Sequence, residues 1–227
     1  MGRTRGRLAA LALALALCAL IASGETPTAE QFAAEGFESL FNGNDLDGWE
    51  GDTVGYRAEG GVLVCAAGKQ LCTTRAFSQF VFYFEFKLSP GANNGLGIWM
   101  EPGDHAAYDA IELQILDNSA EQYKDIQPYQ YHGSIYGIVP AKREHLEPVG
   151  EWNRQTVIVK ERRITVILND VVIVDANVDE AVANGAMDHK EHPGLKRARG
   201  RIGFLGHDSH LEFRNIWVKN IDDGDDD

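Results

Sequence analysis

Two polar side chains on an otherwise apolar stretch are the first candidates for chemistry in this sequence. Residues 109–118 read Asp-Ala-Ile-Glu-Leu-Gln-Ile-Leu-Asp-Asn, and successive side chains along a strand point to opposite faces. Glu112 and Gln114 therefore share one face, about 7 Å apart, while three alternating aliphatic residues form a core face. Buried polar groups without partners cost free energy, so this pair either braces the sheet or binds a ligand.

Glu112 is the first candidate for a general acid or base. Its apolar flanks favour a raised pKa through desolvation, which suits proton transfer; the alternative is a carboxylate held by backbone amides or an arginine. Gln114 would orient a ligand hydroxyl or brace the neighbouring strands. Asp117 lies five residues further on and falls on the opposite face, so a turn-capping role is expected of it and of Asn118. A glycosidase with two facing carboxylates is therefore not supported by this strand.

A second polar cluster runs over residues 129–136, Tyr-Gln-Tyr-His-Gly-Ser-Ile-Tyr. His132 titrates near neutrality and is the candidate proton carrier, unless it is a surface loop histidine. Tyr136 could donate a hydrogen bond to a substrate oxygen or simply pack. His207 is a further pocket candidate. Trp99 is either a stacking surface for a sugar ring or an ordinary core residue.

Short strands separated by Gly, Asn or Pro must position these groups. The clearest has Phe at 80, 82, 84 and 86, a half-buried alternation. Segment 177–199 is expected to be a long loop with a short helix near 179–183. The expected strands are 61–65, 79–88, 95–100, 110–116, 133–139, 152–160, 164–168, 171–175, 200–204 and 211–219. So many strands with so little helix predict an all-β antiparallel sandwich or jelly roll.

The N-terminus has the pattern of a secretory signal. Three arginines precede an apolar run from Leu8 to Ala22, which is too short to span a bilayer comfortably and is followed by small residues. Cleavage is expected after Gly24, which predicts an exported protein, periplasmic or extracellular, without a stable membrane span. The expected organisation is a signal peptide (1–24), a linker (25–36), one domain (37–221) and an acidic tail (222–227).

Charge and cysteine content narrow the possible partners. Loss of the three arginines with the signal peptide takes the formal net charge from −13 to −16. A strongly acidic protein is a poor binder of the phosphate backbone, so nucleic acid is not an expected partner. Cys65 and Cys72 flank an expected hairpin turn, and in an oxidising compartment a disulfide is predicted between them.

Several phrases of the sequence stand in an order that resembles a known family. They are Leu40–Trp49, Asn93–Gly95, Glu112–Asn118, Gly133–Gly137, Gly150–Asn153, Ile164–Asn169, Gly203–His207 and Glu212–Ile216. Together they resemble the 3-keto-disaccharide hydrolase domain family over about residues 37–221. The resemblance implies a concanavalin-like jelly roll of two antiparallel sheets, an extracytoplasmic location and, in some members, activity on oxidised glycosides.

The resemblance also bears on the substrate-binding residues. Asn94 joins Gln114, Tyr136, His207 and Trp99 in the expected substrate-binding set. Many members have an arginine near the position of Trp99 and a glutamine where this chain has Leu205. Both positions are expected to line the pocket, so the two departures leave open a changed substrate or reduced activity.

The chemistry of a 3-keto sugar defines what the site must supply. Its C2 proton is acidified, so a base that removes it and an acid that protonates the leaving oxygen at C1 would break the glycosidic bond by elimination. Water would then add back, and donors must stabilise the C3 oxygen. The sequence thus predicts a hydrolase or lyase acting on a carbohydrate, with Glu112 and His132 sharing the proton transfers.

Two other functions remain open at this point. The departures favour a non-catalytic carbohydrate-binding module on the same fold, and a polar strand face that only braces the sheet would suit an interaction domain. No cofactor is expected. A divalent metal on His132, His207 and Glu112 is chemically reasonable, but no spacing in the sequence supports it.

Overall fold

The structure, a computed structural model, describes residues 26–222, so the predicted signal peptide and nearly all of the acidic tail lie outside the described residues. The chain divides into a short unit that ends at Glu38 and a large unit that begins at Ser39. The expected linker contains a six-residue helix, α2 (Ala29–Ala34). Thr28 and Gln31 form a reciprocal capping box at its start, which satisfies two backbone donors.

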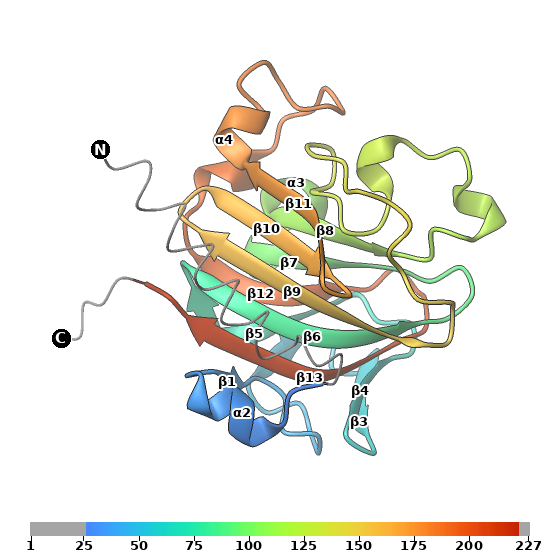
Figure 1. Ribbon diagram of the computed structural model, residues 1–227, viewed down its shortest axis with the longest axis vertical. Coiled ribbons are helices and arrows are strands. Elements are labelled where there is room, and N and C mark those ends of the chain that lie inside the picture. Colours follow the sequence, from blue (N-terminus) through green and yellow to red (C-terminus); the bar gives the residue numbers. More distant parts are fainter. Residues whose placement is uncertain (1–25, 223–227) are drawn as a thin grey trace. The chain divides into compact units, whose positions relative to one another are not determined.

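The described part of the large unit is built mainly of strands, with five short helical segments of about one turn each in the loops; Figure 1 shows their arrangement. Its elements, with β1 at the unit boundary, are β1 (Glu38–Ser39), β2 (Trp49–Gly51), β3 (Tyr56–Glu59), β4 (Val62–Cys65), β5 (Gln70–Phe77), β6 (Phe80–Leu88), β7 (Asn93–Met100), α3 (Ala106–Asp109), β8 (Ile111–Leu116), η1 (Glu121–Tyr123), η2 (Pro128–Gln130), β9 (Trp152–Lys160), β10 (Arg163–Leu168), β11 (Val171–Asn177), α4 (Val178–Ala181), η3 (Pro193–Lys196), β12 (Gly200–Leu205) and β13 (Leu211–Asn220). Within residues 26–222, no helix is long and apolar enough to cross a bilayer.

Two antiparallel sheets form the sandwich. One has the strand order β11-β10-β9-β6-β13-β4-β3, and the other is five-stranded with the order β2-β5-β12-β7-β8. Figure 1 shows β9, β6 and β13 in front of β7, β12 and β5. The pairs among strands β2 to β13 are antiparallel, and several of them, such as β6 with β13 and β5 with β12, join strands far apart in sequence, which confirms the predicted jelly-roll sandwich of two antiparallel sheets.

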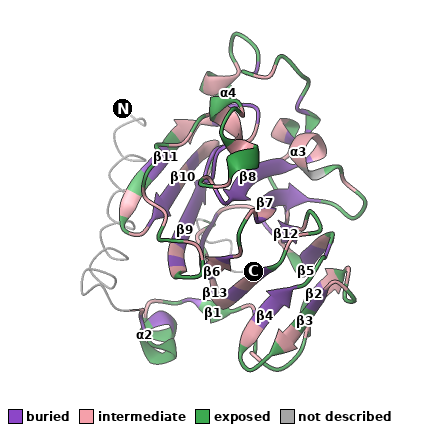
Figure 2. Ribbon diagram, turned by 90° about the vertical axis from the view of Figure 1, so that its right-hand side faces the viewer, coloured by how far each residue is buried: buried purple, intermediate pink, exposed green. Residues whose placement is uncertain are grey.

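The core lies between the sheets and follows the alternation read from the sequence. The four phenylalanines of β6 and Leu88 all belong to one apolar cluster, as does Phe204 of the facing sheet. Phe84 and Phe204 meet edge to face, with ring centroids 5.7 Å apart, a favourable geometry for aromatic pairs. Figure 2 shows buried residues concentrated along the strands and exposed residues in the connections.

The disulfide prediction is wrong in this structure. Cys65 and Cys72 are both free and buried. Cys65 ends β4 and belongs to the core between the sheets, whereas Cys72 lies on β5 of the other sheet. Leu71 points into the core, so Cys72 points the opposite way. The two strands are therefore not a hairpin, and the thiols face different environments.

Segment 133–139 is not the strand that its sequence predicts. Gly133 and Gly137 have φ values of +79° and +75°, so the backbone reverses twice within five residues. Only isolated bridges form, between Leu113 and Ile135 and between Ile135 and Val139. The segment still pairs with the edge of β8, because the Tyr136 amide donates to the Glu112 carbonyl at 2.9 Å.

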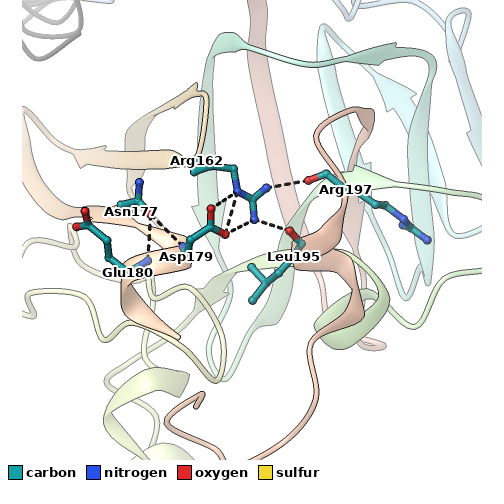
Figure 3. A network of polar contacts seen from close by, with 6 residues as sticks. All are labelled: Arg162, Asn177, Asp179, Glu180, Leu195 and Arg197. Carbon is teal, nitrogen blue, oxygen red and sulfur yellow. Dashed lines mark hydrogen bonds and ion pairs between the residues drawn. The ribbon is translucent and has the colours of Figure 1, made fainter. Parts of the chain in front are cut away.

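The long segment after β11 is confirmed as a loop that begins with a short helix, α4, and it is anchored at both ends. Arg162, in the turn between β9 and β10, makes a forked ion pair with Asp179 of α4 (Figure 3). The same guanidinium donates to the carbonyls of Leu195 and Arg197 near the end of the segment. One side chain thus ties the two ends of segment 179–197 together.

Candidate functional site

A cavity of about 200 Å³ lies against the face of β8 that is turned away from the core. Strands β7 and β8 supply its floor, and α3, η1, η2, the 131–139 segment and the loop after β12 supply its walls. The residues that line it are Asn93, His105, Ala107, Tyr108, Glu112, Gln114, Leu116, Tyr123, Ile126, Gln130, Tyr136 and His207. Of the predicted site residues, Glu112, Gln114, Tyr136 and His207 meet here.

Glu112 is the one carboxylate among the lining residues. Only 5% of its surface is exposed, and burial raises the pKa of its carboxyl from 4.5 to about 7. Within residues 26–222 no hydrogen bond or ion pair is formed by this carboxyl group, which rules out the expected alternative of a carboxylate held by backbone amides or an arginine. A desolvated carboxyl that is half ionised near neutral pH can both accept and return a proton.

Gly95 on β7 makes room for this carboxyl. It lies beside Gln114 in the register, and Glu112 lies beside Gly97. A Cβ atom at position 95 would stand 2.3 Å from Glu112 Oε1, and no positive φ is involved there. The lack of a side chain at this position therefore sets where the carboxyl group lies.

Gly95→Ala is expected to fold and to lose most of whatever activity depends on Glu112. The added methyl group meets the flexible end of a side chain, not backbone, so the carboxyl group shifts; misplacement of a reacting group by about 1 Å can cost about 100-fold in rate. Circular dichroism and steady-state kinetics check this. Unchanged kcat in a folded Gly95→Ala protein would show that the carboxyl position is unimportant.

Gln114, two residues along the strand from Glu112, also lines the cavity. Its amide donates to Asn93 Oδ1 at 3.1 Å, and both side chains line the cavity. Asn94, which the sequence analysis placed among the binding residues, points into the core instead. There its Oδ1 accepts from the amides of Gly95 and Leu205 at 2.9 and 3.0 Å, which ties β7 to β12. The residue that lines the cavity is the neighbouring Asn93.

Tyr136 lies next to Glu112 and has its hydroxyl in the cavity wall. Gln130 donates to this hydroxyl at 2.9 Å, and the ring packs edge to face on Tyr129. Burial, opposed by the Gln130 hydrogen bond, raises the pKa of the Tyr136 phenol, so it stays a donor at neutral pH. It can give a hydrogen bond to a developing oxyanion.

Two imidazoles line the same cavity. Partial burial lowers the pKa of His207; Asp208 raises it, while the nearby His105 lowers it. His105 stacks on Tyr108 with ring centroids 5.2 Å apart. Imidazole nitrogens can accept hydrogen bonds from sugar hydroxyls or donate hydrogen bonds to them. Both His105 and His207 line the cavity.

The assignment of His132 as a proton carrier is wrong, because it does not reach the cavity. The residue is 2% exposed, with Nε2 3.0 Å from Gln155 Oε1 on the opposite sheet, and Nδ1 accepts a hydrogen bond from the Leu116 amide. It stacks on Phe86 at 5.1 Å. Burial lowers the pKa of His132 to about 4, against a smaller opposing effect of the Gln155 contact. His132 is a neutral bridge between the sheets.

Trp99 and Leu205 also lie outside the cavity lining. Trp99 is a core residue, 1% exposed, whose indole nitrogen donates to the Ser78 carbonyl at 3.0 Å. The core alternative is therefore confirmed and the sugar-stacking one is not. Leu205 packs with Met100 and Ala110 in a small cluster. Contrary to the expectation, neither Trp99 nor Leu205 contributes a side chain to the cavity wall.

Asp117 caps a turn, as predicted from its position on the opposite face of the strand from Glu112. It accepts from the Ser119 amide and hydroxyl at 2.9 and 2.6 Å and from the Gly91 amide at 2.8 Å, which caps the turn after β8. In the part of the chain that the structure describes, no three His, Cys, Asp or Glu side chains gather as a possible metal site. The predicted absence of a cofactor stays a prediction.

The fold and site define a class of protein, a jelly-roll β-sandwich with a carboxyl-centred cavity on the outer face of one sheet. The 3-keto-alpha-glucoside-1,2-lyase-like domain family matches residues 36–219. The chain belongs to this family, as its sequence phrases predicted.

Named relatives agree with this membership. A 3-keto-disaccharide hydrolase from Bacteroides thetaiotaomicron is 24% identical, over 83% of this chain and 80% of that protein. Two solved structures designated glycosyl hydrolases, from Parabacteroides distasonis, are each 24% identical. They cover 82% and 87% of this chain and 99% of their own, with TM-scores of 0.73 and 0.75. The structural likeness shows a shared fold.

Proposed function

We propose that the protein is an exported enzyme that cleaves 3-keto-disaccharides or related oxidised glycosides by elimination followed by addition of water. Family membership supports the substrate class. The observation that carries the proposal is Glu112: a buried carboxyl with a pKa of about 7, without a protein partner among residues 26–222, that lines a cavity.

The reaction can proceed with this one carboxyl. The Glu112 carboxylate takes the C2 proton, and negative charge develops on the C3 oxygen, towards which the Tyr136 hydroxyl can donate. When the C3 carbonyl re-forms, the C1–O bond breaks, a C1–C2 double bond forms and the leaving oxygen takes a proton. Addition of water then puts a hydroxyl on C1 and a proton on C2, so the net reaction is hydrolysis.

The same Glu112 carboxyl can serve both proton transfers. C1 and C2 are neighbouring atoms, so a proton taken from C2 lies close to the oxygen leaving C1. A pKa of about 7 lets the group be ionised for the first transfer and protonated for the second at neutral pH. This replaces the predicted pair of Glu112 and His132, and leaves Gln114, His105 and His207 to bind hydroxyl groups.

The test compares matched substrates. Purified protein without residues 1–24 is incubated with a 3-keto-glucoside and with the same glycoside unoxidised, and released aglycone is measured by chromatography. Release from the keto substrate alone is the expected result, because only that substrate has an acidified C2 proton. If neither substrate turns over while calorimetry detects sugar binding, the protein is a carbohydrate-binding module and the proposal fails.

A further inference from the structure

A lysine from the long loop reaches the wall of the cavity. Tyr108 lies on α3 and lines the cavity. Lys190, between α4 and η3, places its ammonium group on the Tyr108 hydroxyl, with Nζ 2.6 Å from the phenol oxygen. A hydrogen bond from a charged donor is shorter and stronger than a neutral one, so this contact links a cation to a cavity residue.

The contact decides what the Tyr108 hydroxyl can do. Its oxygen accepts from Lys190, and within residues 26–222 its own proton is donated to no protein acceptor. Tyr136 is arranged in the same way, because its hydroxyl oxygen accepts a hydrogen bond from the Gln130 side-chain amide. Each phenol can donate one proton. Two phenol protons are thus available to a ligand in one cavity, one of them polarised by a full positive charge.

Lys190 is held by a buried pair. Asp188 Oδ1 lies 3.1 Å from His192 Nε2, and the two side chains are 4% and 2% exposed. The Lys190 amide donates to Asp188 Oδ1 at 3.0 Å, the Asp188 amide donates to the Gly137 carbonyl at 3.0 Å, and the His192 ring lies 5.3 Å from the Tyr108 ring. The loop is therefore docked on the turn after Tyr136 and on Tyr108 itself.

We propose that Lys190 acts through Tyr108 as a positioning residue that stabilises the anion formed on the C3 oxygen of the substrate. This rests on the proposed function. Transfer of the C2 proton to Glu112 moves one negative charge from that carboxylate to the substrate, and the Lys190–Tyr108 pair supplies positive charge and a donor for it. The charged and titratable groups around Lys190 are Tyr108, Asp188 and Tyr136.

The test uses Lys190→Met, Lys190→Arg and Tyr108→Phe, with Lys196→Met as the matched control on the same loop, where the side chain is exposed. For Lys190→Met we expect kcat on a 3-keto-glucoside to fall about 10-fold to 100-fold with little change in KM. The control keeps wild-type kcat, and Lys190→Arg restores most of the loss. Exchange of the C2 proton in D2O should slow in parallel with kcat.

A double variant separates this role from a general effect on the fold. If Lys190 acts through Tyr108, Lys190→Met adds little to Tyr108→Phe, because the partner is already gone. Two results would overturn this inference alone. One is a double variant in which the kcat losses of the two single variants multiply. The other is a Lys190→Met protein with the same kcat as Lys196→Met while the wild type is active. If the wild-type protein neither cleaves the substrate nor exchanges its C2 proton, the proposed function is overturned, and this inference with it.

Discussion

Glu112→Gln is expected to lower the turnover of a 3-keto-glucoside by about 1,000-fold, within the range for loss of a general acid or base. The amide has nearly the shape of the carboxyl group but cannot accept the C2 proton. No hydrogen bond of the described chain is lost, because the carboxyl forms none within residues 26–222. The loss should therefore lie in kcat and not in folding.

The measurement is steady-state kinetics on protein whose melting temperature is recorded first. Glu151→Gln is the matched control, since Glu151 is exposed and precedes β9, away from the cavity lining. It should retain full activity. A folded Glu112→Gln protein with wild-type kcat would clear Glu112 of a catalytic role, and the proposed mechanism would have to be abandoned.

The floor of the site could be predicted because the alternation of side chains along a strand can be read from neighbouring residues in the sequence. Three core residues alternate with Glu112, Gln114 and Leu116, and the structure keeps this alternation. The raised pKa of Glu112 follows from the same apolar setting. The space that lets its carboxyl group lie over Gly95 depends on the register with β7, which is long-range information that no local pattern contains.

The errors at Asn94 and His132 have different physical origins. Asn94 differs from the true lining residue, Asn93, by one position, and a change of one residue reverses the face. His132 was placed in the site because an imidazole titrates near neutrality and this one stands in a cluster of aromatic and polar residues. Its loop turns back at Gly133 and inserts the ring between the sheets, where Gln155 satisfies it.

Apart from Tyr136 and His207, the walls of the site could not be predicted. Tyr108 lies on a one-turn helix and Lys190 in a loop without periodicity, and they are 82 residues apart in sequence. Their contact depends on loop anchors such as Arg162, which bonds to Asp179 and to the carbonyls of Leu195 and Arg197 (Figure 3). A loop of this kind is fixed by tertiary contacts, so its composition alone suggests only a solvated connection.

The stability of the protein should show the cost of the raised pKa of Glu112. The folded-state pKa of about 7 lies above the ordinary value of 4.5, so the unfolded carboxyl ionises first as pH rises. Stability from this group is complete below pH 4.5 and is lost as pH rises towards 7. Each pH unit between the two pKa values is worth about 1.4 kcal/mol, so the loss is about 3 kcal/mol.

His132 has the opposite dependence. Its folded-state pKa of about 4 lies below the ordinary 6.5, so its contribution is complete above pH 6.5 and is lost as pH falls towards 4. Between about pH 4.5 and 6.5 the two contributions change in opposite directions with similar size. From these two groups alone, wild-type stability should be nearly flat across that window.

Glu112→Gln removes one side of this balance. Its unfolding free energy, from urea titrations between pH 4.5 and 8, should equal that of wild type near pH 4.5. It should exceed wild type by about 3 kcal/mol above pH 7, because a neutral amide carries no ionisation cost. Glu151→Gln should follow wild type at every pH. A Glu112→Gln curve parallel to wild type would mean that Glu112 titrates normally in the fold; divergence with rising pH would mean that the protein sacrifices stability to keep a proton-transfer group in its cavity.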